Sequence, residues 1–197
     1  AWAIFGMFFM IMIISESIIG ERSGGSWTRL KLIPGSFSDI LIGKMLFYVL
    51  LGIIQFNLML LVGVFLMPVF GLPSLDVGHA PLQLMTLVCC ISCCATSFGI
   101  LIGTLFHTTN QALPVAAISV VILSAIGGVW VPVEVLPDSL KAISIISPMR
   151  WGLEGINNIL LRECAWKELL KPICILLSGT ILTMMISWMI ENRRMNQ

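Results

Sequence analysis

The chain has 197 residues, of which 58% are hydrophobic and only 11% are charged. Soluble domains carry about 25% charged residues, so this composition and a mean hydropathy of +1.02 exclude an ordinary soluble protein and predict an integral membrane protein. The net charge is only +1, without the clustered Lys and Arg that phosphate binding needs, so no nucleic-acid partner is expected.

Long apolar stretches predict an all-α polytopic membrane protein with the lipid bilayer as its surroundings. A bilayer crossing takes about 20 apolar residues in a helix. The predicted spans cover residues 1–14, 40–67, 82–106, 112–131 and 169–190. The first is short and begins without Met or the features of a secretory signal, so we expect the chain to start partway through a longer protein. The transmembrane domain then covers residues 1–190, N-terminally incomplete, and residues 191–197 form a cytoplasmic tail.

A polar segment over residues 15–39 separates the first two spans. Its side chains combine charged hydrogen-bond donors with apolar anchors: Arg22, Arg29, Lys31, Trp27, Leu30 and Leu32. Gly24 and Gly25 permit a turn out of the first span, and Pro34 ends the segment. We interpret the segment as a docking element for a partner protein. The alternative is a solvated connector whose charges only set the topology.

The distribution of Lys and Arg predicts the orientation. Residues 15–39 and the C-terminal residues lie on one face and hold several cations, whereas the hairpin between the second and third spans has no Lys or Arg. Short loops decide topology best by the positive-inside rule. We therefore expect residues 15–39 and the C-terminus to be cytoplasmic, in a multi-pass protein of the cell inner (plasma) membrane.

Residues 128–168 mix both charge signs with apolar residues at helical spacing. Pro148 divides two apolar stripes, formed by Leu140, Ile143 and Ile146 and by Leu153, Ile156 and Leu160. This pattern predicts two short amphipathic helices at the outer interface.

Few residues offer catalytic, metal or ion-coupling chemistry. Apart from Lys44 and Lys171, each near the start of its span, the predicted second to fifth spans contain no Asp, Glu, Lys, Arg or His, which disfavours proton- or ion-coupled transport. No phosphate-binding G-x-x-x-x-G-K-[ST] motif occurs, so any ATP must be hydrolysed elsewhere. His79 and His107 are expected to be plain loop residues. We predict no catalytic residue, no metal site and no cofactor on this chain.

A cluster of cysteines and two pairs of residues on predicted helices each allow two structural interpretations. The cluster Cys89, Cys90, Cys93 and Cys94 contains C-x-x-C spacing, but turns of one helix converge poorly on a metal, so packing is favoured. Gln55 and Asn57 are candidates for a translocation path or for interhelical hydrogen bonds. Gly99 and Gly103 predict close helix approach, within the chain rather than in a dimer.

Two motifs resemble those of type-2 ATP-binding-cassette (ABC) exporter permeases. The first is similar to E-R-x-x-G-[TS]-x-x-R-L-x-x-x-P followed by G-K, and consists of Glu21, Arg22, Gly25, Ser26, Arg29, Leu30, Pro34, Gly43 and Lys44. The second is similar to the outer re-entrant segment G-x-x-x-P-x-E-x-x-P followed by Pro and an aromatic, and consists of Gly128, Pro132, Glu134, Pro137, Pro148 and Trp151. Ser26 replaces the commoner Thr, and Trp27 is bulkier than the family pattern.

The resemblance implies a bundle of six spans, five of them visible here, and a function in transport. Residues 21–34, including Trp27, would couple to a separate ABC ATPase subunit that binds ATP and Mg. Gly127, Gly128, Pro132, Glu134, Pro137 and Pro148 would form the outer gate. A second permease copy or paralogue would complete a homo- or heterodimer that exports a hydrophobic or amphipathic drug, antibiotic, lipid or peptide.

Two other classes of function stay open at this point. A channel or secondary carrier would transport without an ATPase. A membrane-embedded enzyme such as a lipid transferase would need converging acidic or His residues, for which Glu134, Asp138 and Glu154 are the candidates. The identity of the cargo is not determined by these patterns.

Overall fold

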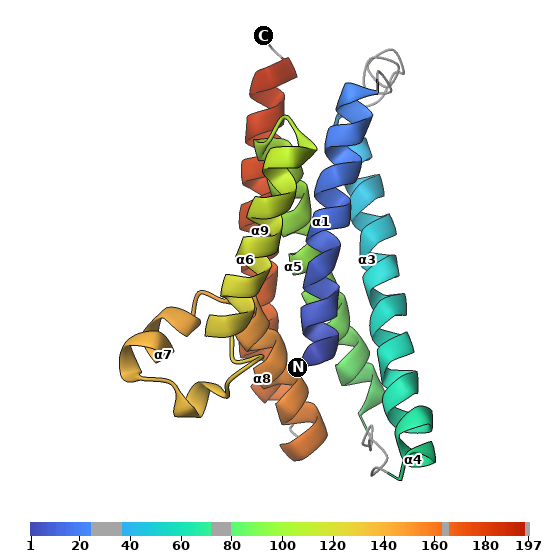
Figure 1. Cartoon of the computed structure of the whole chain (residues 1–197), viewed down its shortest axis with the longest axis vertical. Helices are drawn as coiled ribbons and strands as arrows, with labels where there is room; N and C mark the ends of the chain where they lie inside the picture. Colours follow the sequence, from blue (N-terminus) through green and yellow to red (C-terminus); the bar gives the residue numbers. More distant parts are fainter. Residues whose placement is uncertain (25–36, 72–79, 163–165, 196–197) are drawn as a thin grey trace.

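Five helices long and apolar enough to cross a bilayer form an elongated bundle in the described part of the chain (Figure 1). The computed structural model describes residues 1–24, 37–71, 80–162 and 166–195. The long helices are α1 (Trp2–Ser23), α3 (Phe37–Leu61), α5 (Pro81–Leu105), α6 (Thr109–Ile126) and α9 (Trp166–Met195). No strand occurs in these ranges, and the prediction of an all-α polytopic membrane protein is confirmed.

Shorter elements continue or connect the long helices. Helix α3 runs on through a π-helical turn, η1 (Val62–Leu66), into α4 (Met67–Val69). Between α6 and α9 lie the 3₁₀ turn η2 (Val133–Val135), α7 (Asp138–Ser144) and α8 (Pro148–Arg162). The two helices predicted on either side of Pro148 are therefore present as α7 and α8, and their position at the outer interface stays a prediction.

Helix α5 is the centre of the bundle. Within its most apolar stretch 67% of residues are buried, against 17% for α9, and α5 contacts α1, α3, α6, α8 and α9. Its buried side chains include Leu84, Leu87 and Ile91; a Cβ on Gly155 of α8 would lie 2.6 Å from Leu87, and one on Gly152 of α8 would lie 3.1 Å from Ile91. Cys90 and Cys94 of α5 belong to this packed core, whereas Cys89 and Cys93 are partly exposed.

Small residues let the helices approach α5 closely. A Cβ placed on Gly99 would lie 2.9 Å from Ile14 Cβ, and one on Gly103 would lie 3.0 Å from Ile18 Cβ. Close approach at such residues increases van der Waals contact, which is what holds helices together in lipid. The predicted intrachain packing of Gly99 and Gly103 is thus confirmed, with α1 as the partner helix.

The outward faces of α3 and α9 are apolar. Leu46 and Phe47 of α3 are 74% and 61% exposed, and many Leu, Ile and Met side chains of α9 are likewise exposed. Exposed apolar area of this extent suits contact with lipid chains rather than with water.

Helix ends differ from the predicted spans where tertiary contacts decide them. Helix α1 continues past Glu16 to Ser23, and α9 continues past residue 190 to Met195. Helix α6 stops at Ile126, short of the predicted end at residue 131, because Gly128 adopts a φ of +87° that a helix does not allow. Helix α6 begins at Thr109, three residues before the predicted start of this span, and therefore contains Pro114 in its interior.

Candidate functional site

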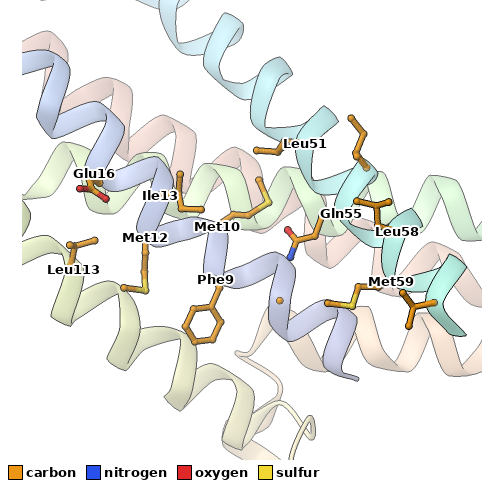
Figure 2. Close-up of a pocket in the computed structure, with 13 residues that line it drawn as sticks. Phe9, Met10, Met12, Ile13, Glu16, Leu51, Gln55, Leu58, Met59 and Leu113 are labelled. Carbon is orange, nitrogen blue, oxygen red and sulfur yellow. The ribbon is translucent and has the colours of Figure 1, made fainter. Parts of the chain in front are cut away.

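An apolar groove of about 790 Å³ lies between α1 and α3, with a contribution from α6 (Figure 2). Most of its lining residues are Leu, Ile, Val, Met and Phe. The full lining is Gly6, Phe9, Met10, Met12, Ile13, Glu16, Leu51, Ile54, Gln55, Leu58, Met59, Val62 and Leu113. Glu16 and Gln55 supply the polar groups of this wall.

Helical periodicity explains why these residues share one cavity. The α1 residues 6, 9, 10, 13 and 16 follow a spacing of three or four positions, and so do residues 51, 54, 55, 58 and 59 of α3 and residue 62 of η1. At 3.6 residues per turn each set forms one stripe along its helix. Both helices are apolar on every side, so the sequence pattern alone did not distinguish the stripe that lines the groove from the one that faces lipid.

The two predicted path residues of α3 point to different places. Gln55 extends into the groove toward α1, where a Cβ on Gly6 would lie 3.1 Å from its Nε2 atom (Figure 2). Asn57 instead donates through Nδ2 to the Ile53 carbonyl at 2.8 Å and contacts Met85 Sδ at 3.7 Å. Gln55 is therefore the one of the pair that an apolar ligand in this groove would meet.

The first two residues of the predicted coupling motif make ion pairs inside the bundle. Glu21 accepts from Lys44 Nζ at 2.6 Å, which joins α1 to α3. Arg22 pairs with Glu191 of α9 and donates to the Gly103 carbonyl of α5 at 3.0 Å. The remaining coupling residues, namely Gly25, Ser26, Trp27, Arg29, Leu30 and Pro34, lie outside the described residues, and the coupling role of the motif stays a prediction.

The segment predicted to be the outer one, residues 128–168 (hereafter the outer segment), contributes most of the lining of a second cavity of about 1010 Å³. Four of the six predicted gate residues line it: Gly127, Gly128, Pro132 and Glu134. Pro137 and Pro148 do not line it and instead begin helices, Pro137 as the N-cap of α7 and Pro148 as the first residue of α8. Pro suits such positions because a helix start leaves the backbone N–H without an intrahelical partner.

Tight packing joins the outer segment to the end of α6. Ser147 Oγ donates to the Leu123 carbonyl at 2.7 Å, and a Cβ on Gly127 would lie 2.6 Å from that same oxygen. Trp151, part of the predicted outer motif, is 4% exposed and donates through Nε1 to the Ile145 carbonyl at 2.8 Å. The Lys171 ammonium lies 4.9 Å from the Trp151 ring centroid, a cation–π distance that ties α8 to α9.

Only two of the three candidate acidic residues of an enzyme line the same cavity. Glu134 and Glu154 line the outer cavity, whereas Asp138 is fully exposed and pairs with Lys141 at 3.4 Å. Across the described ranges no three His, Cys, Asp or Glu side chains are placed to hold a metal. His107 lies 3.3 Å from an Arg194 nitrogen, while His79 lies outside the described residues.

Sequence reasoning missed Glu191. It was assigned to a polar tail, but it lies on the last turns of α9 and is only 2% exposed. Two features of the sequence point to Glu191: it directly follows an apolar span, and it lies on the same predicted face of the membrane as Arg22. A carboxylate at the end of a membrane span needs a cationic partner, which Arg22 can supply.

Comparison with known proteins places the chain in a transporter family. A model of the ABC-2 family transporter protein matches residues 2–189. The linearmycin resistance permease protein LnrN of Bacillus subtilis (strain 168) is 25% identical over 174 residues, covering 88% of this chain and 43% of that protein. The chain thus spans less than half the length of this curated relative, and no solved structure matches it. Because the family model covers nearly every described helix, the chain belongs to the ABC-2 family of transporter proteins, as its two sequence motifs predicted.

Proposed function

We propose that this chain is the membrane-spanning permease subunit of an ATP-driven exporter for a hydrophobic or amphipathic compound. The carrying observation is the apolar groove between α1 and α3, in a chain of the ABC-2 transporter family. Ligand sites of this kind combine apolar walls with a few polar groups that fix orientation. Gln55 and Glu16 fill that role here. The relative from B. subtilis is named for resistance to linearmycin, which supports a toxic compound as cargo.

In this proposal ATP is hydrolysed on a separate ABC ATPase subunit, and the chain works beside a second permease copy or paralogue. Residues 25–34 dock on the ATPase at the cytoplasmic face, where the C-terminus also lies. Support comes from the charge distribution: α1 and α9 end in Arg22, Arg193 and Arg194 at the same end of the bundle, while the α3–α5 hairpin has no Lys or Arg (Figure 1).

The function is tested in vesicles that contain this protein together with an ATP-binding-cassette ATPase subunit that co-purifies with it. We expect transport of a lipophilic fluorescent dye that requires ATP and both proteins. Dye transport by the permease alone, driven by an ion gradient, would instead establish a secondary carrier.

The groove is tested by filling it. Gly6→Leu places a side chain against Gln55 Nε2, so we expect dye transport to fall while ATPase binding persists. The matched control is Leu46→Phe, which adds bulk on an exposed part of α3 outside the groove lining. Equal transport by Gly6→Leu and the wild type would contradict the assignment of the groove.

The orientation is tested with an impermeant maleimide in a variant without native cysteines. Ser139 is exposed on α7, so a cysteine there should be labelled from outside intact cells. Ser147 is unsuitable for this purpose because its side chain is fully buried. Labelling of Ser139→Cys only after lysis would reverse the proposed orientation.

A further inference from the structure

Three long helices meet in a buried ion-pair cluster at the end of the bundle that holds the C-terminus (Figure 1). Arg22 of α1 pairs with Glu191 of α9, and Arg194 of α9 lies 3.9 Å from the same carboxylate. Both arginines also donate to the end of α5. We call this set of Arg22, Glu191 and Arg194 the clasp.

The clasp supplies the hydrogen bonds that the C-terminus of α5 lacks. Arg22 Nη1 donates to the Gly103 carbonyl at 3.0 Å, and Arg194 Nη1 donates to the Thr104 carbonyl at 2.7 Å. Both carbonyls belong to the last turn of α5, which ends at Leu105 and therefore has no further intrahelical donors for them. Cations are also favoured at this end of a helix by its dipole.

Burial makes the clasp sensitive to the loss of any member. The side chain of Glu191 is only 3% exposed and that of Arg22 is 16% exposed. A buried carboxylate is tolerated when it is paired, and removal of one partner leaves the other charge uncompensated. Helices α1, α5 and α9 are therefore held at this point in one relative position.

The clasp also lies where the predicted coupling segment joins the bundle. Arg22 lies two residues before Gly24, which is the last described residue before residues 25–36. Its neighbour Glu21 binds Lys44, near the start of α3, at 2.6 Å. Two adjacent residues of α1 therefore make these connections. Glu21 joins α1 to α3, and Arg22 joins α1 to α5 and α9. A displacement of residues 25–34 would therefore be transmitted through these contacts to α5, the centre of the bundle.

We propose that Glu191 is a positioning residue for transport, which holds Arg22 on α5 so that movement of the coupling segment displaces α1, α5 and α9 together. This inference rests on the proposed function, because it assigns the clasp to the step that follows ATP hydrolysis. It extends that function to α9, a helix that does not line the α1–α3 groove.

The test compares dye exported per ATP hydrolysed for the wild type and Glu191→Gln in the reconstituted complex. Gln keeps the shape and an acceptor oxygen but removes the charge that holds Arg22. We expect ATP hydrolysis to stay within about twofold of the wild type while dye export per ATP falls about tenfold, a typical size for coupling between sites. Glu191→Asp, which keeps the carboxylate, should recover most of the export.

Two further variants separate positioning from a general effect of charge or folding. Arg193→Gln removes a cation from the exposed side of the same helix turn and should behave as the wild type. Combined with Arg22→Gln, the Glu191→Gln change should cost less than the sum of the two single changes, because both break the contact between Arg22 and Glu191. If Glu191→Gln does not fold, Arg22→Lys carries the same expectation, since a lysine cannot bond Glu191 and the Gly103 carbonyl in fork geometry.

The outcomes distinguish this inference from the proposed function. A wild-type complex without ATP-dependent export would reject the proposed function and the clasp with it. A working wild type with unchanged export per ATP in Glu191→Gln would reject the clasp alone. An equal loss in Arg193→Gln would also reject it, because the effect would then follow surface charge.

Discussion

The two ends of the bundle use polar contacts differently. At the C-terminal end, Arg22 pairs with a residue 169 positions away and bonds a carbonyl 81 positions away, and Arg194 bonds one 90 positions away. In the outer segment, Arg150 bonds Ser144 at a separation of 6 residues and the Lys141 carbonyl at a separation of 9. The first end is thus held by long-range contacts and the second mainly by local ones.

This difference predicts how each end responds to change. A long-range buried contact restrains several helices, so its loss affects the stability of the whole bundle. A local contact shapes its own segment, which is attached to the bundle through contacts such as Ser147 with Leu123 and Trp151 with Lys171. The outer segment is therefore expected to move or unfold locally while the bundle stays intact.

The largest effect is expected from Arg22→Met. It leaves the buried Glu191 carboxylate without its main partner, and breaking a buried pair in this way costs about 3 kcal/mol or more. The free energy of unfolding is measured in detergent by denaturant titration. Arg193→Met, on the exposed side of α9, is the control, and equal stability of the two variants would contradict the long-range role of the clasp.

Gly103→Leu is expected to have the next largest effect. The new side chain would collide with Ile18 and with the backbone at Ser15, where a Cβ alone would already lie 3.0–3.1 Å away. Overpacking of this kind costs about 2 kcal/mol. Thermal unfolding in detergent measures it against Gly43→Leu, since no atom lies within 4 Å of a Cβ at Gly43. A stable Gly103→Leu protein would show that α1 can move away from α5 at little cost.

Ser147→Ala should destabilise the outer segment locally. The change removes the 2.7 Å hydrogen bond to the Leu123 carbonyl, which contributes about 1 kcal/mol. Hydrogen exchange followed by mass spectrometry should show faster exchange over residues 137–148 and unchanged exchange in α5. The exposed Ser139→Ala serves as the control. Faster exchange throughout α5 would show that the outer segment is not a local unit.

Lys141→Ala should have the smallest effect. Its ammonium pairs with the fully exposed Asp138 at 3.4 Å, and such surface pairs contribute little because water and salt screen them. The backbone carbonyl that accepts from Arg150 is retained. We expect an unfolding midpoint equal to that of the wild type, and a clear loss of stability would remove the contrast between the two ends.

Part of the candidate site could be predicted from the sequence. Gln55 stood out because a polar side chain is rare in an apolar span, and the predicted gate residues Gly127, Gly128, Pro132 and Glu134 were found through the resemblance to the outer motif of the permease family. The groove itself was not predictable, because its walls consist of the same Leu, Ile and Met residues that face lipid elsewhere.

The sequence by itself determined the class, the number of visible spans and the family, because length and hydrophobicity limit what can cross a bilayer and the two motifs have characteristic spacing. Only the tertiary structure decided that α1 and α9 continue beyond their apolar runs and that Glu191 is buried. The reason is physical: a charged residue remains in a helix at the membrane edge when a partner from another helix compensates it, and that partner is set by packing rather than by local sequence.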